Sequence, residues 1–232
     1  MSIRQYAPVT SIILDTTGHA AGVVVGGTER IDASSIVVAA GPWSMPLCAP
    51  LGIRLPLRAQ REQILLIAPG EPMRNAPVFS DLVSLQYVRT ERSGEILVGN
   101  SDHASPEFTD PDHYSNHADD AYIATAVEKL DHRLPKLPDP SLSSTYAGCY
   151  DVTPDYNPIL SATPVHDLYV CAGFSGHGYK ISPAVGTLMA DIVTQGASSD
   201  PRINAEDFRL ERFEQQLLLN SQHPYSGAGQ MR

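Results

Sequence analysis

One short segment has residue types and a spacing that could do chemistry. Residues 172–186 read AGFSGHGYKISPAVG, with Gly173, Gly176 and Gly178 around a serine and a histidine and with Lys180 directly after them. When a strand is followed by a glycine loop and the start of a helix, free backbone N–H groups and the positive end of the helix dipole point toward one place. The segment therefore indicates a site for an anionic group. A tight connection that only needs small residues is an equal alternative on this segment alone.

The same segment disfavours two common site types. Its glycine spacing is GxxGxG, whereas dinucleotide-binding loops carry GxGxxG with an acidic residue about twenty positions later in a second βαβ unit. The chain also has no GxSxG elbow, so a serine hydrolase is disfavoured.

His103, His113 and His117 lie in a loop rich in Asp and Pro, but their spacing is irregular and no cysteine accompanies them. We therefore predict no metal site.

Strands are predicted before and after residue 55, with a different apolar pattern in each part. Residues 36–40 are apolar at successive positions, which is typical of a strand buried on both faces in a parallel sheet. The later strands alternate around a hairpin turn at ERSG, which indicates an antiparallel sheet. The other expected strands are residues 9–15, 20–27, 61–68, 76–81, 83–90, 94–102, 144–150 and 167–173.

Two helices are predicted from apolar spacing. Asp119 is a suitable N-cap for the first, which KLPDPS ends. Ser182 can cap the second, Pro183 fits its first position and Gly196 can end it in a left-handed turn. The apolar stripes are Ile123, Ala126, Val127, Leu130 and Leu134 in the first helix, and Val185, Leu188, Met189 and Ile192 in the second.

The overall composition narrows the class of partner. The 232 residues carry a net charge of −10 with no Lys/Arg cluster, which argues against nucleic acids and anionic membranes. The N-terminus has no signal-peptide core, and no apolar run is long enough to span a bilayer. The three cysteines, Cys48, Cys149 and Cys171, form no CxxC pair. These features predict a soluble cytoplasmic protein with a small-molecule partner.

The order of motifs along the chain adds a specific resemblance. SIVVAAGPWS, LPLRAQREQ, YDVTPDYNPIL, DLYVCAGFSGHGYKISPAVG and FRLERF follow one another. In this order they resemble the D-amino-acid oxidase/sarcosine oxidase superfamily of FAD-dependent amine oxidoreductases. The resemblance implies an α/β (α+β) fold with a partial FAD-binding, glutathione-reductase-like domain and an antiparallel-sheet substrate domain. It assigns residues 1–56 and 146–232 to the FAD-binding domain and residues 57–145 to the substrate-binding domain.

The resemblance also assigns roles to residues. The glycine loop would lie against the flavin ring, and Lys180 would bind the substrate carboxylate as the catalytic and binding residue. Arg61, Tyr87 and Tyr150 would contribute to the substrate pocket, although a surface arginine and simply packed tyrosines are the common alternatives. Gly148 stands where some members carry a flavin-linking cysteine, so FAD is expected to be non-covalent. The residues expected at the cofactor are Ala40, Gly41, Trp43, Gly148, Gly173, Phe174, Ser175, Gly176, His177, Gly178, Tyr179 and Lys180.

The implied function is oxidation of a secondary or tertiary amine, or of an amino acid, by hydride transfer to FAD. Sarcosine-like and dimethylglycine-like compounds are the expected substrates. Members of this superfamily begin with a GxGxxG βαβ unit that the chain lacks, so it corresponds to their C-terminal portion and a partner chain could supply that unit. The strand at residues 36–40 would then expose an edge and a face. The alternative is a non-catalytic remnant or assembly subunit that binds no FAD alone.

Overall fold

The computed structural model describes residues 2–73, 76–102 and 104–220. The chain divides into two compact units. The first unit contains Met1–Arg58 and Asp151–Leu219, and the second is built around Ala59–Tyr150.

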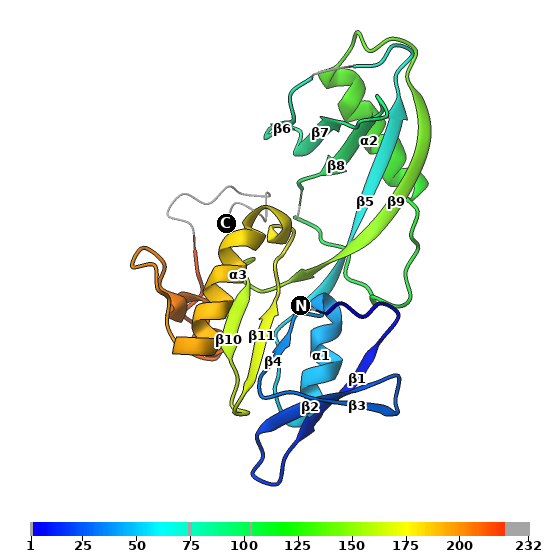
Figure 1. The fold of residues 1–232 in the computed structure, drawn as a ribbon. Helices are drawn as coiled ribbons and strands as arrows, with labels where there is room; N and C mark the ends of the chain where they lie inside the picture. The colour runs from blue at the N-terminus through cyan, green and yellow to red at the C-terminus, as the bar shows by residue number, and fades with distance from the viewer. Residues whose placement is uncertain (1, 74–75, 103, 221–232) are drawn as a thin grey trace. The chain divides into compact units, whose positions relative to one another are not determined.

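A three-stranded meander begins the first unit (Figure 1). Its strands are β1 (Val9–Leu14), β2 (Ala20–Val25) and β3 (Glu29–Asp32), paired antiparallel in this order. The β-branched runs of β1 and β2 form strands, as predicted, and glycines with positive φ form the turns of the meander. One side of the meander buries Ala20 and packs Ile12 and Val23 against the main core of the unit.

A second sheet of the first unit contains β10 (Ile159–Ala162), β11 (Leu168–Ala172) and β4 (Ile36–Val38). β4 runs parallel to β11, whereas β10 is antiparallel to it. β10 was not predicted from the sequence. The predicted burial of residues 36–40 on both faces is wrong, because Val37 is 43% exposed while Ile36 and Val38 are buried. The helix that covers this face packs over β10, and β4 is the strand farthest from β10 in the sheet.

That helix is α3 (Gly178–Gln195), and it begins earlier than predicted. Ser182 is not its N-cap and Pro183 is not its first residue, because both lie inside the helix. Pro183 has no N–H to donate to the carbonyl of Tyr179 four residues earlier. The Ser182 hydroxyl donates to that carbonyl instead, at 3.0 Å, so the helix tolerates the proline. The end at Gly196 is as predicted, with φ 75°.

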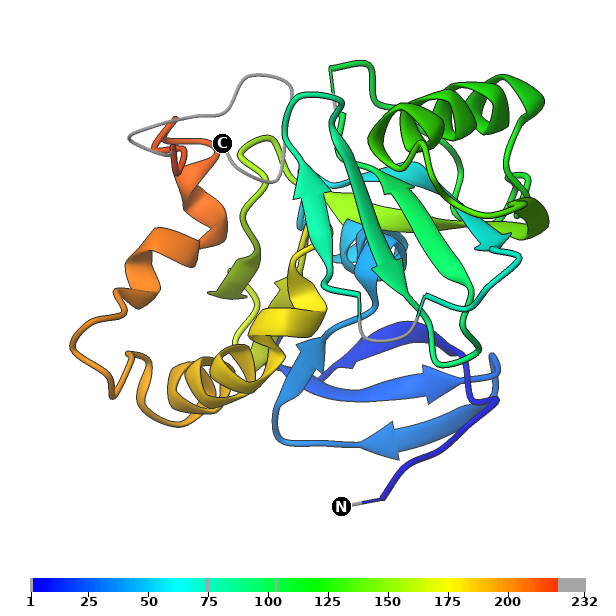
Figure 2. The same ribbon diagram turned by 90° about the horizontal axis from the view of Figure 1, so that it is seen from above.

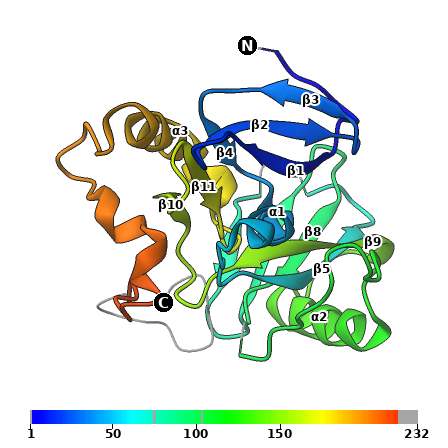
Figure 3. The same cartoon turned by 90° about the horizontal axis from the view of Figure 1, so that it is seen from below.

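Two clusters of apolar side chains form the core of the first unit, one on each face of the second sheet. Figure 3 shows the strands and helices that contribute them. On one face, Leu188, Met189 and Ile192 of α3 pack against Leu160 of β10. On the other face, side chains from β4, β10 and β11 pack against the meander and a helical connection. That connection is η1 (Gly41–Trp43), α1 (Ser44–Cys48) and η2 (Ala49–Leu51). The unit ends in two short turns of helix, η3 (Ala205–Phe208) and η4 (Leu210–Arg212).

The described residues of the second unit form a five-stranded sheet and one helix. The helix lies along the sheet in Figure 2. α2 (Asp120–Arg133) buries Ala126 and Leu130 against one face of this sheet. Val127, expected in the same stripe, is 41% exposed. No helix in the described ranges has the length and apolar character needed to cross a membrane. The strands are β5 (Arg58–Ala68), β6 (Phe79–Asp81), β7 (Gln86–Thr90), β8 (Ile96–Asn100) and β9 (Ser141–Val152), in the order β6-β7-β8-β5-β9.

Candidate active site

The glycine loop connects β11 to α3 through three residues with positive φ. These are Gly173 at 79°, Ser175 at 51° and Gly176 at 85°. Glycine adopts this conformation at little cost, whereas a serine needs support from its surroundings. Ser175 is fully buried, and its N–H donates to the carbonyl oxygen of Asp151 at 3.0 Å. Its hydroxyl accepts the N–H of Thr153 at 3.2 Å. The shape of the loop is therefore fixed by the end of β9 and by Thr153, which follows it.

Asp151 accepts hydrogen bonds from two residues of the loop, and it was not predicted from the sequence. Its Oδ2 accepts the N–H of Gly173 at 2.5 Å. The same oxygen would lie 3.9 Å from a Cβ placed on Gly41, which itself has φ 54°. Burial raises the pKa of Asp151, and hydrogen bonds from the Gly173 and Phe174 backbone oppose that rise. One buried carboxyl group thus holds the start of the loop and lies close to Gly41.

The start of α3 is open to solvent. Its N-cap residue, His177, makes no side-chain capping hydrogen bond, and the first N–H groups of a helix have no partner within the helix. Gly176, Tyr179 and Lys180 are exposed, and Tyr179 is 97% exposed. Exposed backbone without a Cβ beside an uncapped helix N-terminus fits a flat group whose edge carries negative charge. The residues present therefore fit the flavin that the sequence predicts.

The turn at residues 153–157 contains a buried ion pair and contacts the glycine loop. Arg212 of η4 donates to both carboxylate oxygens of Asp155, at 2.9 and 3.1 Å, and both side chains are almost completely buried. Arg212 also donates to the carbonyl of Asn157 at 2.8 Å. Asp155 in turn accepts the hydroxyl of Thr153 at 3.1 Å. Because Thr153 also contacts Ser175, the C-terminal FRLERF motif stabilises the glycine loop through this turn.

The charge of Asp155 depends on this partner. Burial raises the pKa of Asp155, but the hydrogen bonds and positive charge of Arg212 outweigh burial. The N–H groups of Leu219 and Asn157 add to that effect. The pKa therefore lies below its ordinary value of 3.8, and Asp155 is ionised at neutral pH.

In the second unit, the guanidinium group of Arg61 is surrounded by acceptors from the protein itself. Its buried guanidinium donates to the carboxylates of Glu107 and Asp119, at 3.0 and 2.8 Å for the nearest oxygens. It also donates to the carbonyls of Ser115 and His117. All five N–H groups of an arginine are then occupied. Arg61 therefore has no N–H group left to bind a substrate, contrary to the prediction from the sequence. The carboxylate of Asp119 is used here, which is why this N-cap residue makes no side-chain cap for α2.

Tyr87 and Tyr150 belong to a cluster with Glu62 and Tyr122. The ring of Tyr87 lies over Gly99 of the neighbouring strand, where a Cβ would come within 2.0 Å of its Cζ. Burial, followed by the neighbouring Tyr150, Tyr122 and Glu62, raises the pKa of Tyr87, so its hydroxyl stays protonated. Burial also raises the pKa of Glu62 to about 7. Tyr87 and Tyr150 stay predictions for the pocket wall.

The remaining predicted residues divide between the two units. Ala40, Gly41, Trp43 and residues 173–180 lie in the first unit, and Gly148 lies in β9 of the second. A Cβ on Gly148 would meet nothing within 4 Å. Of the histidines weighed as metal ligands, His103 lies outside the described residues. His113 pairs with Asp110, and the His117 carbonyl accepts from Arg61.

Comparison with known proteins agrees with this fold. Residues 1–192 match the family profile described as DAO, FAD dependent oxidoreductase. Human peroxisomal sarcosine oxidase is 31% identical over 206 residues, which cover 82% of this chain and 51% of that protein. Sarcosine oxidase subunit beta of Rhodobacter capsulatus is 28% identical over 224 residues, covering 95% and 50%. The chain thus spans about half the length of these curated relatives.

Solved structures give the same fold. L-Proline dehydrogenase from P. horikoshii superposes with a TM-score of 0.80 at 24% identity, covering 92% of this chain and 55% of that one. Glycine oxidase from Geobacillus kaustophilus superposes with a TM-score of 0.74 at 22% identity, covering 90% and 53%. Because the family profile extends over most of the sequence, the chain belongs to the DAO family of FAD dependent oxidoreductases.

Proposed function

We propose that the chain forms the flavin-ring side of an FAD-dependent oxidoreductase. Its substrate would be a secondary or tertiary amine or an amino acid of the sarcosine or dimethylglycine type. The observation that carries this proposal is the fixed glycine loop that ends at the uncapped, exposed N-terminus of α3 beside Lys180. The names of the matched sarcosine oxidases support the substrate class.

The glycine loop and the start of α3 would stabilise charge on the cofactor. FAD, when bound, supplies a hydride acceptor for the C–H bond beside the substrate nitrogen. Negative charge that develops at the pyrimidine edge of a flavin is stabilised by backbone N–H groups and by a helix N-terminus. Gly176, whose backbone is exposed, would let the backbone approach the ring, and binding is non-covalent in this proposal.

Lys180 would bind the carboxylate of the substrate. It lies in the first turn of α3 and is exposed, so its ammonium group can reach a ligand. The positive end of the helix dipole adds to the attraction for an anion. Tyr87 and Tyr150 would wall the substrate pocket, as the resemblance implies. Arg61 has no role in binding in this proposal.

A partner segment with a GxGxxG unit would complete the site for the ADP half of FAD. β4 pairs only with β11 in the described part of the sheet, and Val37 is 43% exposed. An unpaired strand edge accepts a further strand. A subunit that assembles without catalysis is the alternative, and flavin reduction distinguishes the two.

Lys180→Met should raise KM for a carboxylated amine by a factor of tens to a hundred. Loss of a hydrogen bond to a charged group costs about 1.5–3 kcal/mol. For an amine without the carboxylate the increase should be much smaller. Steady-state kinetics on the protein combined with a GxGxxG segment would measure both values. Lys136→Met, at an exposed lysine of the second unit, is the control. Equal losses for both substrates would contradict the carboxylate role.

Anaerobic reduction tests the function itself. The protein, combined with the same segment and loaded with FAD, is mixed with N-methylglycine without oxygen, and the flavin absorbance is followed. Bleaching of the oxidised flavin band would support amine oxidation. A stable yellow complex that no N-methyl amino acid, dimethylglycine or simple amino acid bleaches would favour the assembly subunit.

A further inference from the structure

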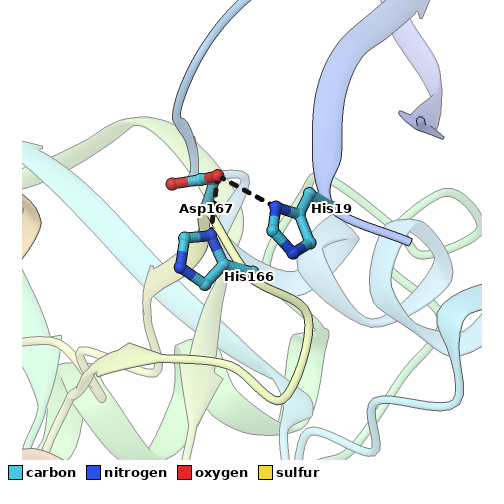
Figure 4. Close-up of side chains that lie close together, drawn as sticks. All are labelled: His19, His166 and Asp167. Atoms are coloured by element: carbon cyan, nitrogen blue, oxygen red, sulfur yellow. Dashed lines mark hydrogen bonds and ion pairs between the residues drawn. The ribbon is translucent and has the colours of Figure 1, made fainter. Parts of the chain in front are cut away.

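Two turns of the first unit bring together two histidines and an aspartate that the proposed function does not use. His19 lies in the β1–β2 turn, and His166 and Asp167 lie in the β10–β11 turn (Figure 4). Both imidazole rings direct Nδ1 toward the same carboxylate oxygen of Asp167. The rings stack on each other with centroids 4.3 Å apart and planes inclined by 21°.

The separations of these ligand atoms suit a single small cation. Oδ2 of Asp167 lies 2.7 Å from Nδ1 of His166 and 3.9 Å from Nδ1 of His19. One ligand atom from each of the three residues lies within 4.8 Å of the others. Zinc bonds of about 2.0–2.1 Å place two tetrahedral donors about 3.3 Å apart. The two distances to Asp167 bracket that value, so small side-chain rotations would place all three donors around one ion.

The backbone holds the three residues in place. The carbonyl of His166 accepts the N–H of Ala20 at 2.9 Å, which ties the two turns together. The carbonyl of Asp167 accepts the N–H of Ile36 at 2.8 Å. The N–H of His19 donates to the carboxylate of Asp15 at 3.0 Å. Only side-chain rotation is therefore needed to form the site.

The three side chains remain accessible to an ion from solvent. Their exposed fractions are 45% for His19, 68% for His166 and 29% for Asp167. Imidazole nitrogen with one carboxylate oxygen is a donor set that suits Zn²⁺, Ni²⁺ and Cu²⁺ better than Ca²⁺ or Mg²⁺. Three protein donors leave a fourth tetrahedral position for water.

We propose that His19, His166 and Asp167 form a binding site for one divalent transition-metal ion, with Zn²⁺ as the probe. The inference is independent of the proposed amine oxidation, since none of the three residues lies in the glycine loop or in α3. A bound ion would cross-link the meander to the sheet that carries β11 and β4. An ion that binds only the folded chain stabilises it by mass action, so Zn²⁺ should raise the unfolding temperature.

The test measures Zn²⁺ binding to the full chain after treatment with a chelator. Titration calorimetry should give one ion per chain, and Co²⁺ should give the visible absorption of a tetrahedral site. His19→Gln, His166→Gln and Asp167→Asn should each weaken binding at least about tenfold, since even residues that only orient a ligand change affinity 10–100-fold. The double variant of both histidines should bind no ion.

His113→Gln is the matched control. His113 is an exposed histidine with an aspartate partner, Asp110 at 3.0 Å, and no metal-ligand cluster among the described residues includes it. This variant should bind Zn²⁺ as the wild type does. Fluorescence of Trp43, the only tryptophan of the chain, reports whether each variant keeps the fold of the first unit. Failure of the wild type to take up one ion would overturn the proposal. Unchanged uptake by a folded double variant would overturn it too.

Discussion

Arg212→Met should lower the free energy of unfolding of the first unit by about 3–5 kcal/mol, because it leaves a buried charge without its partner. Asp155 and Arg212 are both almost completely buried, and methionine supplies similar volume without any donor. The turn at residues 153–157 and the glycine loop should loosen together, since Thr153 connects them. Urea unfolding followed by Trp43 fluorescence would measure the change in the first unit.

Arg4→Met is the matched control for this experiment. Arg4 also pairs with a carboxylate through two hydrogen bonds, to Glu29 at 2.8 and 2.7 Å, but both side chains are about half exposed. Exposed pairs contribute little because water solvates the separated charges. The unfolding curve of Arg4→Met should therefore stay close to that of the wild type. Equal effects of the two substitutions would show that the buried pair does not stabilise the turn.

Acid should reduce the contribution of the buried pair. The folded pKa of Asp155 is lower than 3.8, so the unfolded chain takes up a proton before the folded one as the pH falls. The stability from this group is complete well above pH 3.8 and is lost as the pH falls through the folded pKa. The difference between wild type and Arg212→Met should consequently be largest near neutral pH and narrow in acid.

Gly173→Ala should destabilise the first unit by about 2–5 kcal/mol for two separate reasons. The φ of 79° is unfavourable for any residue with a Cβ, at about 1–2 kcal/mol. The added Cβ would also lie 2.5 Å from Cγ2 of Thr153 and 2.9 Å from Cδ2 of Leu57, and overpacking of this kind costs about 1–3 kcal/mol. Urea unfolding again measures the total.

Gly52→Ala separates the two causes. Gly52 has almost the same φ, 76°, but a Cβ there would meet nothing within 4 Å. Its substitution should show only the conformational cost of about 1–2 kcal/mol. If Gly173→Ala were no more destabilising than Gly52→Ala, the close approach of the loop to Thr153 and Leu57 would be wrong.

Local patterns in the sequence predicted much of the fold. Strands β1, β2 and β11 and the stripe of α3 follow from residue types and spacing over a few positions. Pro183 misled the prediction of the start of α3, because proline usually marks a first turn and the compensating Ser182 hydroxyl is visible only in three dimensions. The exposure of Val37 depends on how far α3 extends across the sheet, which no local pattern reports.

Contacts between residues far apart in the chain could not be predicted from the sequence. Asp155 and Arg212 are 57 positions apart, and each looks like an ordinary polar residue in its own segment. Arg61 also looked available for substrate until its carboxylate and carbonyl partners were placed around it. His19 and His166 are brought together only by the pairing of two turns. By contrast, the glycine loop was found because it is contiguous.

Flavin binding by a Gly176→Val variant tests the central claim that the glycine loop contacts the flavin ring. The protein is fused to an N-terminal GxGxxG segment, and the flavin absorbance per chain is measured for the wild type, Gly176→Val and Gly186→Val. Gly186 is an exposed helical glycine where a Cβ would meet nothing within 4 Å, so it controls for the added side chain. We expect wild type and Gly186→Val to be yellow with stoichiometric FAD, and Gly176→Val to lose it. A colourless wild-type fusion, or unchanged flavin content in Gly176→Val, would contradict the account.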